Sequence, residues 1–206
     1  MAKELKKRAR RKEERPAEIL DAAFEEFVKA GYAATRLEDV AARAGVTKGT
    51  IYFYFDTKER VFDEMIRHKS RAIFSEIKST SSELTGSYTA RLHALIAFVC
   101  RRVANDRVSR ETLRFLIAEG SRFPDLVERH HDEFMEPILK QFEELINAGI
   151  AAGEFRPLTA SRLPDIMLSP ALLLSLWSML FGNRRKIDVN SFVSASIDLL
   201  THGIAR

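Results

Sequence analysis

The sequence predicts an all-α protein, and three observations support this fold class. Apolar residues recur at intervals of three and four along most of the 206 residues, which is the spacing of one face of an α-helix. Glycine and proline interrupt these segments where helices are expected to end. No segment alternates polar and apolar residues with the period of two that indicates a strand. We expect about nine helices, arranged as a small N-terminal trio followed by a larger C-terminal bundle.

The first helix and the second are bounded by residues with known preferences for helix ends. Pro16 suits the first turn of a helix that continues to Gly31, because a first-turn residue needs no backbone N–H. Thr35 and Glu38 have the spacing of a capping box that would begin the second helix. Gly45 can adopt the left-handed conformation that ends it.

The next two helices follow with almost no connecting residues. Thr47 is the expected cap of a third helix, with Ile51 and Phe55 on one face. Asp56 or Thr57 is the expected cap of a fourth helix of roughly 20 or more residues.

The remaining helices lie beyond a polar stretch at residues 79–87. They are expected over residues 88–105, 110–120, 124–153, 159–181 and 188–204. Residues 166–182 carry no charge, but as a helix they cover only about 25 Å, less than the roughly 30 Å hydrocarbon core of a membrane. We therefore expect a helix buried on several sides and no membrane partner.

Composition and charge narrow the possible functions. Hydrophobic residues make up 46% and charged residues 30% of the chain, as in globular proteins. Cys100 is the single cysteine, which excludes an internal disulfide and favours a reducing compartment. No apolar run follows the basic N-terminus, so a secretory signal is not expected. The predicted location is the cytoplasm.

Positive charge is concentrated in the first 15 residues. This segment holds eight basic and three acidic residues, a net charge of +5, whereas the whole chain carries +4. A local basic arm of this kind indicates a polyanionic partner. A solvated tail is the alternative that composition alone leaves open.

Residues 35–62 have the pattern of a helix-turn-helix. Alanines in the second helix permit close approach of the third, and Gly45 permits a tight turn between them. The third helix begins with the polar residues Thr47, Lys48, Gly49 and Thr50. Because the second helix of such a unit lies in the major groove of DNA, its outward side chains must suit bases and phosphates.

The stretch "GYAATRLEDVAARAGVTKGTIYFYFDTKERVF" closely resembles the DNA-binding pattern of the tetracycline-repressor (TetR) family of bacterial transcription regulators. The resemblance covers about 50 residues and implies an N-terminal DNA-binding domain followed by a helical ligand-binding and dimerisation domain. On this basis the chain divides into a basic arm at residues 1–15, a helix-turn-helix domain at 16–56 and a C-terminal domain at 57–206.

The resemblance assigns DNA contacts residue by residue. Phe53 stands where many members have a second tyrosine, and Tyr54 replaces a more common histidine. The positions expected to contact phosphates or bases are Thr35, Arg36, Thr47, Lys48, Gly49, Thr50, Tyr52, Tyr54 and Lys58, with Arg11 and Arg15 of the arm.

In the family, the C-terminal bundle encloses a small-molecule ligand and forms a homodimer through its last two long helices. Each candidate pocket residue is also compatible with an ordinary core position. The pocket candidates are Phe74, His93, Phe98, Leu116, Phe134, Met167 and Trp177. The dimer candidates are Leu173, Leu180, Phe192, Ile197, Leu200 and Ile204.

No enzyme motif and no metal or cofactor site is predicted. His130 and His131 are adjacent, so on a helix they point about 100° apart. The sequence therefore predicts a ligand-responsive repressor that binds a pseudo-palindromic double-stranded operator as a homodimer. The alternatives are a nonspecific architectural DNA-binding protein, or a helical small-molecule carrier or enzyme.

Overall fold

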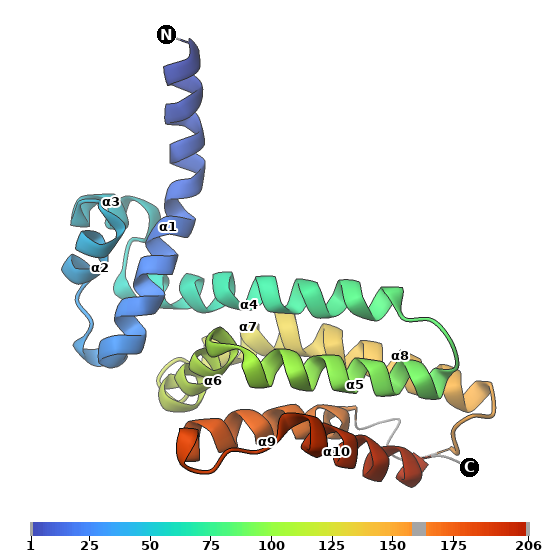
Figure 1. The fold of residues 1–206 in the computed structure, drawn as a ribbon. Helices are drawn as coiled ribbons and strands as arrows, with labels where there is room; N and C mark the ends of the chain where they lie inside the picture. Colours follow the sequence, from blue (N-terminus) through green and yellow to red (C-terminus); the bar gives the residue numbers. More distant parts are fainter. Residues whose placement is uncertain (1, 158–163, 205–206) are drawn as a thin grey trace. The chain divides into compact units, whose positions relative to one another are not determined.

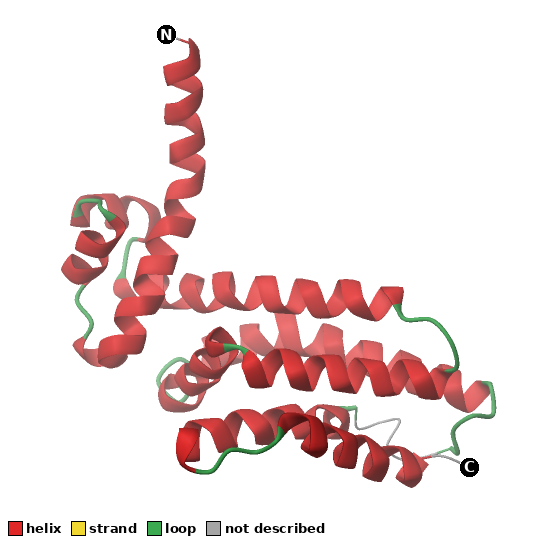
Figure 2. Cartoon of the chain, viewed as in Figure 1, coloured by secondary structure: helices red, strands yellow, loops and turns green. Residues whose placement is uncertain are grey.

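The computed structural model describes residues 2–157 and 164–204, with side chains from residue 14 to residue 202 in these ranges except at Asn183. These residues form helices joined by short loops and contain no β-strand (Figure 2). The chain divides into two compact units, Met1–Ser70 and Arg71–Arg206. The predicted all-α class is confirmed.

The first unit contains α1 (Ala2–Ala34), α2 (Leu37–Ala44), α3 (Lys48–Phe55) and the first part of α4 (Lys58–Glu83) (Figure 1). Its core is rich in aromatic side chains. The ring of Phe62, from α4, lies 5.0 Å from the rings of both Phe27 and Tyr32 in edge-to-face geometry. Because α4 supplies Phe62 and Val61 to this core, the compact unit extends to Ser70.

The first helix begins earlier than expected. It runs from Ala2 through Pro16 without a break, whereas the sequence predicted a start at Pro16. Residues 2–15 are mostly lysine, arginine, glutamate and alanine, which have high helix propensity. The backbone departs from helical geometry at Gly31, where φ is 75°. A positive φ favours glycine because no Cβ clashes there.

The prediction of a capping box at the start of α2 is wrong. The N-cap is Arg36, and no side chain caps this helix. Thr35 is instead buried, and its hydroxyl lies 2.7 Å from the Gly31 carbonyl and 3.1 Å from the Glu26 carbonyl. The hydroxyl therefore holds the end of α1, because the kink at Gly31 leaves carbonyl groups that need a donor.

The second unit contains the rest of α4 and α5 (Tyr88–Asn105), α6 (Arg107–Glu119), α7 (Pro124–His130), the π-helical turn η1 (His131–Met135), α8 (Glu136–Ala151), α9 (Asp165–Phe181), the 3-10 turn η3 (Gly182–Arg184) and α10 (Val189–Ile204). Because α7, η1 and α8 run without a break, the described ranges hold nine continuous helices, as predicted. The expected beginning of α9 at residue 159 lies outside the described residues. Among the helices described, none is long and apolar enough to cross a membrane.

The core of the second unit lies between α5, α8, α9 and α10. Leu95, Ile96, Phe142 and Leu174 are each 2% exposed or less. The loop after α8 also contributes through Glu154, whose carboxylate accepts hydrogen bonds from the backbone N–H groups of Tyr88 and Thr89 at 3.0 and 2.9 Å. This carboxylate therefore satisfies the free donors at the start of α5.

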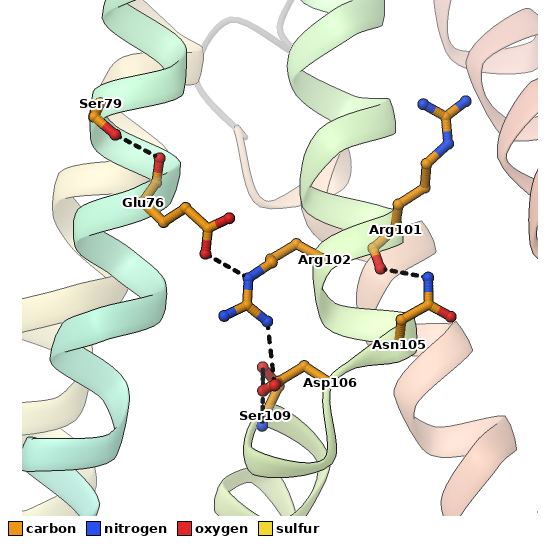
Figure 3. A network of polar contacts seen from close by, with 7 residues as sticks. All are labelled: Glu76, Ser79, Arg101, Arg102, Asn105, Asp106 and Ser109. Atoms are coloured by element: carbon orange, nitrogen blue, oxygen red, sulfur yellow. Dashed lines mark hydrogen bonds and ion pairs between the residues drawn. The ribbon is translucent and has the colours of Figure 1, made fainter.

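A polar network joins α4 to the turn between α5 and α6 (Figure 3). Arg102 lies 2.6 Å from Glu76 of α4 and 3.1 Å from Asp106. Asp106 also accepts a hydrogen bond from the Ser109 backbone N–H at 2.5 Å, as the N-cap of α6. The sequence predicted that α6 begins at Arg110; it begins at Arg107, because Asp106 provides a strong cap upstream.

Candidate nucleic-acid interface

The α2–α3 pair has one buried face and one exposed face. Val40 and Ile51 are fully buried, and Phe55 is 6% exposed. Gly45 ends α2 in the left-handed conformation, with φ 64° and ψ 37°. Val46 N–H then donates to the Ala41 carbonyl at 3.0 Å. This glycine turn lets two short helices meet within a few residues, which is the geometry of a helix-turn-helix.

The N-terminus of α3 presents hydroxyl groups and backbone donors. Thr47 is the N-cap, as predicted, and its Oγ1 accepts from the Thr50 N–H at 3.1 Å. The Thr47 and Thr50 hydroxyls lie 2.9 Å apart. Thr47, Lys48 and Gly49 are exposed. Free N–H groups at a helix N-terminus favour phosphate, because the helix dipole is positive there.

Lys48 is held by an ion pair across the two helices. Its Nζ lies 2.6 Å from Glu38 Oε1 of α2 and 5.5 Å from the centre of the Tyr52 ring. The hydrogen bond from Lys48 lowers the pKa of the Glu38 carboxyl, and the same contact raises the pKa of the Lys48 ammonium. Both groups therefore remain charged near neutral pH. The sequence analysis did not identify Glu38 as a partner of a DNA-contacting lysine.

Four consecutive aromatic residues, Tyr52 to Phe55, end α3, and the first three are at least partly exposed. Tyr52 is 42% exposed and Phe53 is 72% exposed, whereas Tyr54 is half-buried with its ring 5.1 Å from that of Phe53 in edge-to-face geometry. An exposed phenylalanine on this face can contact the methyl group of thymine. Its position was recognisable in the sequence, because Ile51 and Phe55 point inward and the residue two positions after Ile51 points away from them.

The other residues predicted to contact DNA differ in how freely their side chains could reach it. Arg36 is exposed beside the start of α2. The Nζ of Lys58 donates to the Ala33 carbonyl at 3.2 Å and lies 4.7 Å from the centre of the Tyr32 ring, so it also supports the end of α1. Arg15 pairs with Glu18 at 2.9 Å. The side chain of Arg11 lies outside the described residues.

Thr35 differs from the remaining predicted contacts because it is only 3% exposed. Its hydroxyl donates to backbone carbonyl groups inside the unit rather than pointing to the surface.

The predicted pocket residues all belong to the second unit. Phe74 and Phe134 have ring centres 5.2 Å apart, and Phe134 and Met167 are buried. Trp177 Nε1 donates to the Arg185 carbonyl at 2.6 Å, and the buried His93 Nε2 has no hydrogen-bond partner. A cavity of about 380 Å³ lies elsewhere in the second unit and is lined by none of the seven candidates, Phe98 and Leu116 included.

The predicted dimer residues on α9 are exposed. Leu173 is 47% and Leu180 is 74% exposed, and the neighbouring Leu172 of α9 is 49% exposed. On α10, Phe192, Ile197 and Leu200 are half-buried against the core, and the side chain of Ile204 lies outside the described residues. The sequence analysis missed Leu199, which is 76% exposed on α10.

The π-helical turn and the first residue of α8 bring together three groups that can bind metals. Ligand atoms of His131, Asp132 and Glu136 lie within 4.8 Å of one another, and all three side chains are exposed. His130 points elsewhere, with its ring 5.8 Å from that of Phe74, and burial lowers its pKa to about 4. Exposed groups of this kind are common without an ion, and no described group adds a buried ligand.

Two family profiles match the chain. The profile of "Bacterial regulatory proteins, tetR family" matches residues 19–65, and that of "Tetracyclin repressor-like, C-terminal domain" matches residues 83–181. The first covers the helix-turn-helix described above and the second covers most of the bundle. The chain belongs to the tetR family of bacterial transcriptional regulators.

Relatives and solved structures agree with this assignment. The chain is 25% identical over 198 residues to the fatty acid metabolism regulator protein of Bacillus subtilis, covering 94% of this chain and 98% of the relative. It is 27% identical over 151 residues to the transcriptional repressor KstR2 of Mycobacterium tuberculosis, covering 69% and 70%. A tetR-family regulator from Mesorhizobium loti has a TM-score of 0.80 at 20% identity, covering 95% and 99%.

A second solved structure contains a ligand. The regulator FadR of Bacillus subtilis, determined with stearoyl-CoA, has a TM-score of 0.73 at 22% identity and covers 91% of this chain and 98% of its own. At this identity the likeness concerns the fold.

Proposed function

We propose that the protein is a ligand-responsive repressor that binds a pseudo-palindromic operator as a homodimer in the cytoplasm. The observation that carries this proposal is the exposed N-terminus of α3, where Thr47, Lys48 and Thr50 stand above a fully buried Ile51. A rigid helix with a polar outer face and an apolar inner face suits insertion into the major groove.

The residues proposed to contact DNA have different tasks. Arg36, Tyr52 and Lys58 hold the protein on the phosphates, whereas Lys48, Thr50 and Tyr54 approach base edges. Gly49 leaves the backbone close to the groove, and Thr47 orients the helix N-terminus toward phosphate. Arg11 and Arg15 add sequence-independent attraction from the start of α1.

The exposed leucines of α9 and α10 support the homodimer. Monomeric proteins rarely expose a contiguous group of large apolar side chains without a partner for it. Leu172, Leu173 and Leu180 of α9 and Leu199 of α10 are each at least 47% exposed. A symmetric pair of subunits would cover them and would present two recognition helices to two half-sites about 34–36 Å apart, or a multiple of that spacing.

The relationship to named regulators supports response to a small molecule. We propose an apolar or amphipathic effector that binds the second unit and favours a conformation with lower operator affinity. The effector must discriminate between the two conformations by a few kcal/mol to change occupancy strongly.

The deciding experiment is selection of bound duplexes from a random DNA pool at near-physiological salt. Enrichment of a pseudo-palindromic sequence is the expected result. Recovery of unselected DNA that dissociates as the salt concentration rises would contradict the proposal and would favour nonspecific binding through the basic first residues.

A further inference from the structure

The cavity of about 380 Å³ in the second unit is lined by residues from the end of α4, the start of α5 and α8. Figure 1 shows where these helices run in the fold. Its walls combine apolar and polar side chains. The lining residues are Lys78, Ser81, Ser82, Leu84, Tyr88, Arg91, Gln141, Glu144, Leu145 and Ala148. The volume is within the range of small-molecule sites.

Two of the lining side chains contain buried polar atoms without partners. Arg91 Nε and Gln141 Oε1 are both inaccessible, and neither makes a hydrogen bond. The central carbon of the Arg91 guanidinium lies 5.3 Å from the centre of the Tyr88 ring. Buried polar groups in native proteins are nearly always hydrogen-bonded. Both side chains line the cavity, so a bound molecule that reorients them can supply the missing partners.

The charges of the lining residues indicate an anion. Lys78 and Arg91 are cationic and Glu144 is anionic, so the ionised side chains lining the cavity sum to +1. Arg91 Nε–H needs an acceptor, and a carboxylate is the acceptor that guanidinium groups bind most favourably among small organic groups. Rotation of the Gln141 amide by half a turn exchanges its oxygen and nitrogen, so the same position can also donate. Leu84, Tyr88, Leu145 and Ala148 offer surface to an apolar body.

We infer that this cavity binds an organic carboxylate with an apolar tail, whose carboxylate contacts Arg91 and Gln141. The proposed function requires a small-molecule effector, and this inference states the chemical class of that effector. The effect of the ligand on DNA binding rests on the proposed function. The binding itself is testable on the full-length protein without DNA.

The test compares four probes by isothermal titration calorimetry and thermal unfolding. These are octanoate, octan-1-ol, octylamine and inorganic phosphate. Octanoate is expected to bind with a Kd of about 0.1–1 mM, as suits a ligand of roughly ten non-hydrogen atoms. Octan-1-ol and octylamine have the same apolar tail but no negative charge, so they test whether binding requires an anion. Phosphate is an anion without a tail, so it tests whether binding requires the apolar tail. Equal binding by any of the three, or no binding of octanoate, would overturn the inference.

Two variants separate ligand binding from structural support. Arg91→Met should weaken octanoate binding about tenfold or more, because a charged hydrogen bond is lost. Gln141→Leu should weaken binding while leaving the melting temperature of the free protein unchanged or higher, because an unpaired buried acceptor is removed. Arg101→Met is the matched control, since Arg101 is an exposed arginine of the same helix outside the cavity.

The outcomes distinguish this inference from the proposed function. Unchanged octanoate binding in Arg91→Met, or a clearly lower melting temperature in Gln141→Leu, would contradict the site. Selective operator binding by a protein that does not bind octanoate would contradict the ligand class alone. Octanoate binding by a protein that selects no DNA sequence would contradict the proposed function alone.

Discussion

Lys48, at the first turn of α3, lies 2.6 Å from Glu38 of α2. A carboxylate beside a lysine that is proposed to contact DNA has two opposing effects. It orients the ammonium group before binding, and it competes with the DNA for that group. Its own negative charge would also repel the phosphates of a bound operator.

Glu38→Gln should therefore tighten DNA binding by about two- to fivefold at 0.1 M salt, because one competing charge is removed. Lys48→Ala should weaken binding and change which operators are preferred. Fluorescence anisotropy on the selected duplex and on single-base variants measures both effects. Weaker binding by Glu38→Gln would show that orientation of Lys48 matters more than competition.

Thr47→Ala should lower the free energy of unfolding by about 1 kcal/mol, because the N-cap of α3 loses its side-chain acceptor. It should also reduce DNA affinity, since the helix N-terminus becomes less ordered. Thr47→Ser retains the hydroxyl and is the matched control. Urea unfolding followed by circular dichroism provides the measurement, and equal stability of the alanine and serine variants would refute the capping role.

Leu180→Glu should convert the proposed dimer into a monomer, because the interface would have to bury a charge without a partner. Size-exclusion chromatography with light scattering measures the mass. Ile117→Glu is the control, since Ile117 is 58% exposed on α6, which is not one of the two proposed interface helices. A dimeric Leu180→Glu protein would place the interface elsewhere.

Glu154 should make the second unit sensitive to acid. Backbone hydrogen bonds from Thr89 and Tyr88 lower the pKa of the Glu154 carboxyl below its usual 4.5. A lowered folded-state pKa means that its stabilising contribution is complete above the unfolded-state pKa and is lost as the pH falls through the folded-state value.

Glu154→Gln should therefore have a lower melting temperature than the wild type at pH 7, and the two proteins should converge as the pH falls below about 4.5. Differential scanning calorimetry from pH 7 to pH 3 tests this. A difference that is constant over the whole range would show that charge plays no part in holding the start of α5.

Substitutions in the polar network around Arg102 (Figure 3) should lower the free energy of unfolding by different amounts, in a predictable order. Asp106→Ala should lower the free energy of unfolding by about 1–2 kcal/mol, because it removes both the cap of α6 and the partner of Arg102. Glu76→Gln should cost less than about 1 kcal/mol, since an exposed ion pair contributes little. Chemical denaturation of both variants and of the double variant measures their coupling, and a reversed order would contradict the assigned roles.

The sequence by itself determined the helical class, most helix ends and the family. Local chemistry suffices for these features: Gly45 ends α2, Thr47 caps α3, and the apolar spacing around Ile51 and Phe55 fixes which side of α3 is buried. Each of these signals depends on a few neighbouring residues, so it can be recognised from the sequence alone.

The tertiary structure decided which polar groups are available. Thr35 occupies the position in the sequence that is typical of a capping residue, but the kink at Gly31 turns its hydroxyl inward. Lys48 pairs with Glu38, ten positions away, and Arg91 and Gln141 line one cavity from different helices. Partners of this kind depend on how helices pack, because a hydrogen bond requires atoms within about 3 Å and sequence spacing sets no such distance between separate helices.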